Sequence, residues 1–295
     1  MMIHIDEKRC RACGICGDVC PRHIPVTAGQ AGDKRTRISE ERIGLCMSCG
    51  HCMAVCPNSA IEVETLADQA FDGVAPLRTT SDDLLQLMKQ RRSVRNYKKK
   101  SFSGEALAQI LEAVKCSPTG TSGSTNGVIL LDDPEKLKRF SDLCYKSYQS
   151  LDRALKNPIG RFIVRQRAGK RITKTLQEFV MPGMQWYIKW YQEGKSNEII
   201  RDCAALMLFH SPVTIPMAAE NSLIAAFHAI LMAETLGIGT CFNDLIPPIC
   251  HREPDIKRLI GLPDGHEVFA SITMGYPKYK FLRTIPRQLA SVTTV

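Results

Sequence analysis

The sequence predicts a two-domain protein, in which a small cysteine-rich domain precedes a larger domain that mixes helices and strands. Eight of the thirteen cysteines lie between residues 10 and 56, in the stretches CRACGICGDVCP and CMSCGHCMAVCP. Residues 66–80 contain Gly and Pro without strong periodicity, which is typical of a linker. Beyond them, amphipathic helical patterns alternate with short apolar runs. We therefore place the domains at residues 1–65 and 81–295.

Each cysteine stretch has the spacing C-x2-C-x2-C-x3-C-P. Disulfides would require an oxidising compartment, and a zinc site closes with four ligands from two paired halves. The observed run is instead the pattern of bacterial proteins that hold two iron–sulfur clusters, in which the fourth cysteine of each run binds the other cluster. The sequence thus predicts two [4Fe–4S] clusters. We name them cluster one, with ligands Cys10, Cys13, Cys16 and Cys56, and cluster two, with ligands Cys46, Cys49, Cys52 and Cys20.

These residues resemble a bacterial-type ferredoxin, a family of small electron-transfer domains. The connection from Pro21 to Arg42 is longer than in a compact ferredoxin, and its polar, Gly-containing sequence predicts a surface loop with no cofactor role.

The larger domain shows a series of helical and strand patterns. Helices are expected from residue 80 into the segment RRSVRNY at 91–97, at 103–115 and at 222–236, strands at 127–133, 206–216 and 268–277, and helical structure throughout 134–200. Three short motifs follow or connect these elements. RRS at 91–93 offers fixed cations and a hydroxyl that suit a phosphate. The loop SPTGTSGSTNG at 117–127 offers backbone N–H groups and short hydroxyls, and LGIGT at 236–240 lets the backbone approach a flat ligand.

The order RRSVR, SPTG, LGIGT and a C-terminal GYP…R…PR resembles the nitroreductase family over residues 80–290. The resemblance implies an α+β sandwich formed by two intertwined subunits of a homodimer, with FMN at the subunit interface. Together with the cysteine stretches, the chain resembles ferredoxin–nitroreductase fusions.

The resemblance also implies which residues contact FMN. By this resemblance, the FMN phosphate is bound by Arg91, Arg92, Ser93 and Arg95, together with Arg283 or Arg287. The pyrimidine and ribityl groups of FMN are contacted by Ser117, Pro118, Thr119, Gly120, Thr121, Ser122, Ser124 and Asn126. The backbone of Gly237, Gly239 and Thr240 falls near the N5 edge. Where the family often has Asn and Gln, this chain has Ser122 and Ser124, and Asn126 is the expected substitute. No catalytic acid or base is predicted.

The formal net charge of +9 lies entirely downstream of residue 65. Its densest part is RFIVRQRAGKRITK at 161–174, which has six cations and no carboxylate. Because no nucleic-acid-binding motif accompanies it, a solvated basic helix is expected, with a docking face for an acidic redox partner as the alternative. The N-terminus lacks a signal-peptide pattern and no apolar run is uninterrupted enough to span a membrane, so a cytoplasmic protein without membrane or nucleic-acid partners is expected.

The functional expectation is an FMN-dependent oxidoreductase. Two [4Fe–4S] clusters would pass electrons to FMN, which would reduce a small electrophile of the nitro, quinone or enone type. An external ferredoxin or NAD(P)H would supply the electrons. The alternative is a non-catalytic electron-transfer or redox-sensing module that docks a protein partner, and a third class is an iron–sulfur scaffold without flavin.

Overall fold

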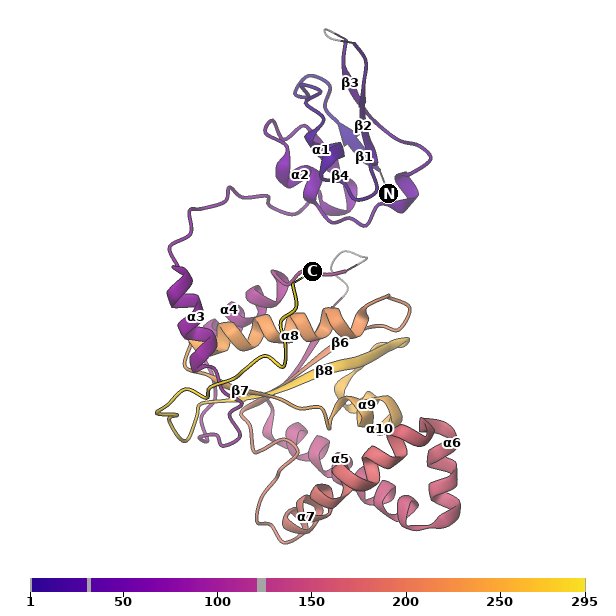
Figure 1. Ribbon diagram of the computed structural model, residues 1–295, viewed down its shortest axis with the longest axis vertical. Helices are drawn as coiled ribbons and strands as arrows, with labels where there is room; N and C mark the ends of the chain where they lie inside the picture. Colours follow the sequence, from indigo (N-terminus) through magenta and orange to yellow (C-terminus); the bar gives the residue numbers. More distant parts are fainter. Residues whose placement is uncertain (1, 31–32, 121–125, 295) are drawn as a thin grey trace. The chain divides into compact units, whose positions relative to one another are not determined.

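The computed structural model describes residues 2–30, 33–120 and 126–294 of the 295-residue chain. The chain forms two compact units (Figure 1). Of the described residues, the first contains those up to Arg78 together with Thr119 and Gly120, and the second contains Thr79–Pro118 and the chain from residue 126 onward. The expected linker lies around this junction, and the boundaries at residues 65 and 81 stay a prediction. No helix in the described ranges has the length and apolarity needed to cross a membrane.

The first unit is built from two antiparallel strand pairs and short helices. One pair joins β1 (Ile3–Ile5) to β4 (Ile61–Val63), and the other joins β2 (Pro25–Ala28) to β3 (Arg35–Ile38). The short helices are α1 (Ile15–Asp18), η1 (Ile43–Leu45), α2 (His51–Val55) and η2 (Glu64–Leu66). The expected surface loop from Pro21 to Arg42 was wrong, because β2 and β3 form a hairpin there with Val26 opposite Arg37. Strands of four residues are too short for a period-of-two pattern to stand out among polar residues.

The second unit contains a four-stranded antiparallel sheet in the order β5-β6-β8-β7. Its strands are β5 (Gly127–Leu131), β6 (Ala205–Pro212), β7 (Gly239–Phe242) and β8 (His266–Gly275). Its helices are α3 (Ser81–Gln90), α4 (Gly104–Lys115), α5 (Pro134–Lys156), α6 (Pro158–Thr175), the π-helical turn η3 (Leu176–Val180), α7 (Met181–Gln192), α8 (Ala218–Thr235), α9 (Pro247–Arg252) and α10 (Pro254–Ile260).

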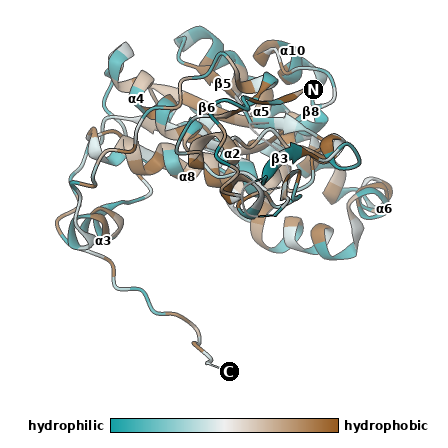
Figure 2. Cartoon of the chain, turned by 90° about the horizontal axis from the view of Figure 1, so that it is seen from above, coloured by the Kyte–Doolittle hydropathy of each residue, from teal (hydrophilic) through white to brown (hydrophobic). Residues whose placement is uncertain are grey.

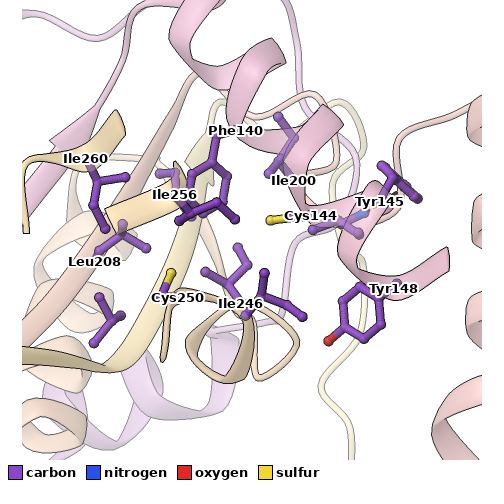
Figure 3. Packing of buried hydrophobic residues seen from close by; sticks show 14 of the residues in the cluster. Phe140, Cys144, Tyr145, Tyr148, Ile200, Leu208, Ile246, Cys250, Ile256 and Ile260 are labelled. Carbon is purple, nitrogen blue, oxygen red and sulfur yellow. Dashed lines mark hydrogen bonds between the residues drawn. The ribbon is translucent and has the colours of Figure 1, made fainter. Parts of the chain in front are cut away.

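Helices cover both faces of this sheet. Along β6, Met207 and Phe209 pack with α4 and α8, whereas Leu206 and Leu208 pack with α5, α9 and α10. This alternation follows from the two-residue period of a strand, and a strand buried on both faces reads as the continuous apolar run ALMLF. Figure 3 shows the core on the face of the sheet that α5, α9 and α10 cover, in which Phe140 and Cys144 of α5 face Cys250 of α9.

The predicted α+β fold class is confirmed by this arrangement. The strand β7 was not predicted, because four residues that begin at Gly239 resemble a glycine turn. The expected helical region 134–200 divides where Asn157 caps α6, since its Oδ1 accepts from the N–H of Ile159 at 2.9 Å and Pro158 occupies the first helical turn.

Candidate functional site

The two cysteine stretches fold alike, 36 residues apart in the chain. At two matching positions in the stretches and one just beyond them, each has a residue with left-handed backbone, which costs a non-glycine residue roughly 1 kcal/mol or more. The matching φ values are 49° and 51° for Ala12 and Ser48, 83° and 75° for Gly14 and Gly50, and 47° and 46° for His23 and Ser59. Both loops therefore adopt the same uncommon conformation.

This conformation directs backbone N–H groups at the thiol sulfurs. The backbone nitrogen of Ala12 lies 3.5 Å from Sγ of Cys10, and that of Ser48 lies 3.5 Å from Sγ of Cys46. The N–H groups of Ile24 and Ala60 lie 3.5 and 3.2 Å from the Sγ atoms of Cys20 and Cys56. Such donors stabilise negative charge on sulfur, which is what a metal-bound thiolate carries.

Two cavities separate the eight cysteines into sets of four. Three cysteines of one stretch and the last cysteine of the other stretch line each cavity. The sets are Cys10, Cys13, Cys16 and Cys56 in one cavity, and Cys46, Cys49, Cys52 and Cys20 in the other. These are the sets that the spacing predicts for cluster one and cluster two. No three Cys, His, Asp or Glu side chains in the described part of the chain converge closely enough to hold one metal ion; in a cubane, by contrast, each thiolate binds a different iron.

One thiol in each cavity has a raised pKa. Burial, followed by the nearby charge of Cys49, raises the pKa of Cys52 to about 11. Burial also raises the pKa of Cys16, and the other three cysteines of its cavity add to the rise. Four thiolates gathered in one cavity therefore need a positively charged metal group, and the donor set fits an iron–sulfur cluster.

In the second unit, the segment after α3 runs beside β7. The N–H of Val94 donates to the carbonyl of Thr240 at 2.9 Å, and Ser93 pairs with Thr240 in a parallel bridge. Gly239 permits this approach, because a Cβ there would lie only 2.6 Å from the Val94 side chain. The RRS and LGIGT motifs are thus neighbours in space.

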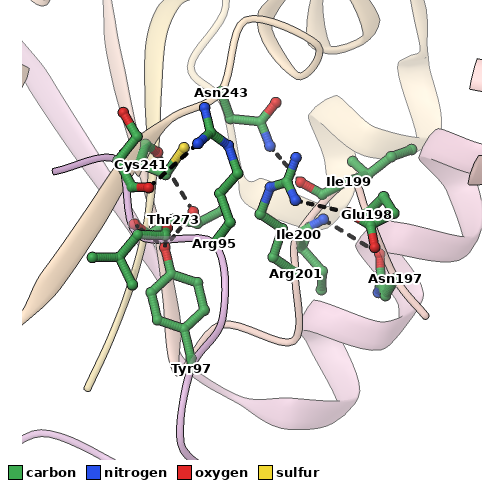
Figure 4. Close-up of polar contacts among 12 residues, drawn as sticks. Arg95, Tyr97, Asn197, Glu198, Ile199, Ile200, Arg201, Cys241, Asn243 and Thr273 are labelled. Carbon is green, nitrogen blue, oxygen red and sulfur yellow. Dashed lines mark hydrogen bonds and ion pairs between the residues drawn. The ribbon is translucent and has the colours of Figure 1, made fainter. Parts of the chain in front are cut away.

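Tyr97 fixes the end of the same segment. Its hydroxyl donates to the Val94 carbonyl at 2.7 Å and lies 2.8 Å from Oγ1 of Thr273 (Figure 4). Burial raises the pKa of Tyr97, so the hydroxyl stays neutral and can donate. The ring packs over Gly275, where a Cβ would lie 2.5 Å from it.

One hollow brings together three separate parts of the predicted flavin site. Arg92, Gly237, Gly239 and Arg283 all line it. Glu234 also lines it, and burial raises the pKa of this carboxyl while Arg91 and Arg92 oppose the rise. Three lysines that were not predicted as site residues, Lys98, Lys278 and Lys280, also line the hollow, and the runs KKK and PKYKFLR were the available sequence signal for them.

Three buried polar atoms of residues predicted to contact FMN lack partners within the described residues. The Nη1 atom of Arg92 donates to the carbonyls of Lys89 and Arg91, each at 2.7 Å, and its Nη2 donates to the Arg283 carbonyl at 3.3 Å. Its Nε has no partner, and neither has Oγ1 of Thr240 or Oδ1 of Asn126. Buried polar groups are nearly always hydrogen-bonded, so the unpartnered Nε of Arg92, the one of these three residues that lines the hollow, fits a polar ligand bound there.

Other predicted residues do not line this hollow. These are Arg91, Ser93, Arg95, Arg287, Ser117, Pro118, Thr119, Gly120, Thr240 and Asn126. Arg95 donates to the Ser93 carbonyl at 3.4 Å, and Asn126 donates through Nδ2 to the Asn221 carbonyl at 3.1 Å. Thr121, Ser122 and Ser124 lie outside the described residues.

Comparisons with known proteins match both parts of the chain. The sequence model described as the nitroreductase family matches residues 88–276, and that of a 4Fe-4S dicluster domain matches residues 6–61. A protein of Archaeoglobus fulgidus, named as a putative NADH dehydrogenase/NAD(P)H nitroreductase, is 25% identical over 197 residues, which are 67% of this chain and 87% of that protein. The NAD(P)H-quinone oxidoreductase subunit I of Gloeobacter violaceus is 27% identical over 105 residues, 30% of this chain and 50% of that protein.

Two solved structures are similar in fold. A nitroreductase with bound FMN from Bacteroides fragilis has a TM-score of 0.55 at 19% identity, covering 74% of this chain and 100% of that one. A nitroreductase with bound FMN from Desulfitobacterium hafniense has a TM-score of 0.51 at 17% identity, covering 72% of this chain and 97% of that one. At these identities the likeness concerns the fold alone.

Proposed function

This chain belongs to the nitroreductase family and carries a 4Fe-4S dicluster domain, and from that premise we propose that it is an FMN-dependent oxidoreductase whose electrons arrive through two [4Fe–4S] clusters. One observation carries the proposal. Two cavities, each lined by three cysteines of one stretch and the fourth of the other, precede a nitroreductase unit on the same chain. The family predicted from the sequence is confirmed.

Different residues of the chain would bind the clusters and the FMN. The eight cysteines would hold the clusters, with backbone N–H groups such as that of Ala60 stabilising the thiolates. Arg92 and Arg283 would hold the FMN phosphate, supported by the positive field of the three lysines in the same hollow. Gly239 would let the backbone approach the flat ring. When bound, clusters exchange single electrons and FMN converts singles into pairs, which is the chemistry that these groups supply.

The finer parts of the proposal concern substrate, donor and assembly. We propose a small nitro, quinone or enone substrate, a reduced ferredoxin or NAD(P)H as donor, and a cytoplasmic homodimer that completes the flavin site. Exposed apolar side chains on α8 and the C-terminal segment support the homodimer. They are Leu223 and Phe227 on α8, with exposed fractions of 48% and 38%, and Leu282, Leu289 and Val292 beyond β8.

A stepwise reductive titration of anaerobically purified protein tests the proposal. Flavin and iron–sulfur absorption are followed together, and we expect both chromophores, with electrons that enter the clusters appearing on the flavin. Clusters without a flavin signal would contradict the FMN assignments from Arg91 to Arg287.

The alternative function is supported by the exposed surface of α6. Ile159, Phe162 and Ile163 are exposed beside the arginines of the basic segment 161–174, so apolar and charged residues are mixed along this helix (Figure 2). Such a surface suits a partner protein of opposite charge. Turnover of a panel of nitro, quinone and enone compounds decides between the two, since rates no faster than those of free FMN favour the electron-transfer module.

Gly239→Ala is expected to weaken FMN binding about tenfold or more, which corresponds to about 1.4 kcal/mol. The added methyl group would lie 2.6 Å from the Val94 side chain, so it would displace Val94 and disturb the hydrogen bond between Val94 and Thr240 next to Arg92. Fluorescence titration of the apoprotein with FMN measures the effect.

The matched control is Gly183→Ala in α7, where an added Cβ meets no atom within 4 Å. Equal FMN affinity in both variants and in the unaltered protein would contradict the placement of Gly239 at the flavin site.

A further inference from the structure

The two cluster loops share a backbone but have different covers. A Cβ built on Gly50, in the loop of cluster two, would lie 3.2 Å from Cζ of Phe71 and 3.4 Å from Cδ1 of Leu66. A Cβ built on the matching Gly14, in the loop of cluster one, would lie 3.8 Å from Oγ1 of Thr27. Gly50 is accordingly buried, whereas Gly14 is only partly buried.

The apolar cover comes from the chain just beyond the last strand of the first unit. After β4, the turn η2 ends at Leu66, and five residues later Phe71 reaches the loop of cluster two. Phe71 keeps 43% of its surface exposed, while Val74 and Leu77 farther on are 100% and 93% exposed. The chain therefore leaves the first unit only after it has covered this loop.

The polar cover of the other loop comes from the hairpin β2–β3. Oγ1 of Thr27 lies 2.8 Å from Oγ1 of Thr36, and Thr36 lines the cavity of cluster one. Two other features are matched. Each cavity has one arginine, Arg11 or Arg22, and the N–H distances to sulfur differ by little between the stretches. The covers therefore differ, since the one beside cluster two is apolar and the one beside cluster one bears hydroxyl groups. The cavities differ in a second way, because His51 lines only that of cluster two and Ile15 only that of cluster one.

Reduction of a cluster adds one negative charge, which an apolar surrounding disfavours and hydroxyl dipoles or water favour. We propose that Phe71 and Leu66 form an apolar cap that makes cluster two the lower-potential cluster of the pair. The proposal rests on the proposed function, because it requires that both clusters are bound. An electron on cluster two would then move to cluster one. Cluster two would be oxidised and cluster one reduced by one electron, and no proton would be transferred.

Potentiometric titration of the full-length protein, followed by electron paramagnetic resonance at pH 8, tests this order. His51 also lines the cavity of cluster two, so the variants and the unaltered protein are all compared at this one pH. In Phe71→Ala we expect the ratio of reduced to oxidised cluster two to rise about tenfold at fixed potential, a shift of about 59 mV toward positive values. The higher of the two midpoints, that of cluster one, stays in place.

The matched variant Thr27→Val removes the hydroxyl from the other cover. We expect it to lower the midpoint of cluster one and to leave cluster two unmoved, so that the two midpoints approach each other. Unmoved midpoints in Phe71→Ala, or a shift of the higher midpoint instead of the lower, overturn the proposal.

The contact itself has a separate test. Gly14→Ala and Gly50→Ala both put alanine at a positive φ, 83° and 75°, but only the second adds a methyl group against Phe71. Phe71→Ala is expected to restore cluster retention in Gly50→Ala and to do nothing for Gly14→Ala. Iron analysis separates the two levels of failure: protein without iron refutes the bound clusters, whereas fully loaded protein with unmoved midpoints refutes only the cap.

Discussion

Cys20→Ala is expected to lose cluster two and to keep cluster one, although Cys20 belongs to the first cysteine stretch. Its side chain lines the cavity that Cys46, Cys49 and Cys52 also line. Removing the fourth thiolate leaves one iron of that cubane without its protein ligand. About four of about eight iron atoms should be lost, and flavin reduction through the clusters should stop or slow severely.

Iron content and paramagnetic resonance of the reduced protein measure this outcome. The control is Cys16→Ala, four residues earlier in the same stretch, which lines the other cavity and should remove cluster one instead. If both variants lose the same cluster, each stretch binds its own cluster and the crossed arrangement is wrong.

Local spacing made the cysteine sets predictable from the sequence, because the ligands of an iron–sulfur loop follow one another within ten residues. Each stretch also has a glycine, Gly14 or Gly50, at a position with left-handed backbone. The covers were not predictable. Phe71 lies in a stretch without periodicity, and Thr27 lies in a hairpin whose strands have four residues.

The flavin site was likewise predictable only in part. RRS and LGIGT were recognisable as short motifs, but their pairing depends on β7, which resembled a turn. The lysines of the hollow come from two positions about 180 residues apart, Lys98 on one side and Lys278 and Lys280 on the other. Without contacts between distant segments, their charges could be counted but not assigned to a site.

Cutting the chain between the two units is expected to slow reduction of the flavin by the clusters about a thousandfold at 1 µM protein. A short flexible linker holds its two ends at an effective concentration on the order of 1 mM, and separated units lose that advantage. The cut belongs between Gly73 and Val74, because an added Cβ at Gly73 meets no atom within 4 Å and Val74 is 100% exposed. Phe71 then stays with the first unit, and α3 keeps its capping box between Thr80 and Asp83.

A protease site inserted at this point lets the same preparation serve as its own control before cleavage. Stopped-flow absorption follows the flavin after the clusters have been reduced. In the intact protein the rate should not depend on protein concentration, whereas after cleavage and separation by gel filtration it should rise in proportion to the concentration of the first unit. The neutral charge balance of residues 1–65 gives that unit little electrostatic steering toward a partner, so the covalent connection is left as the main source of the rate. A concentration-independent rate of the original size in the remixed units would show that the connection contributes nothing.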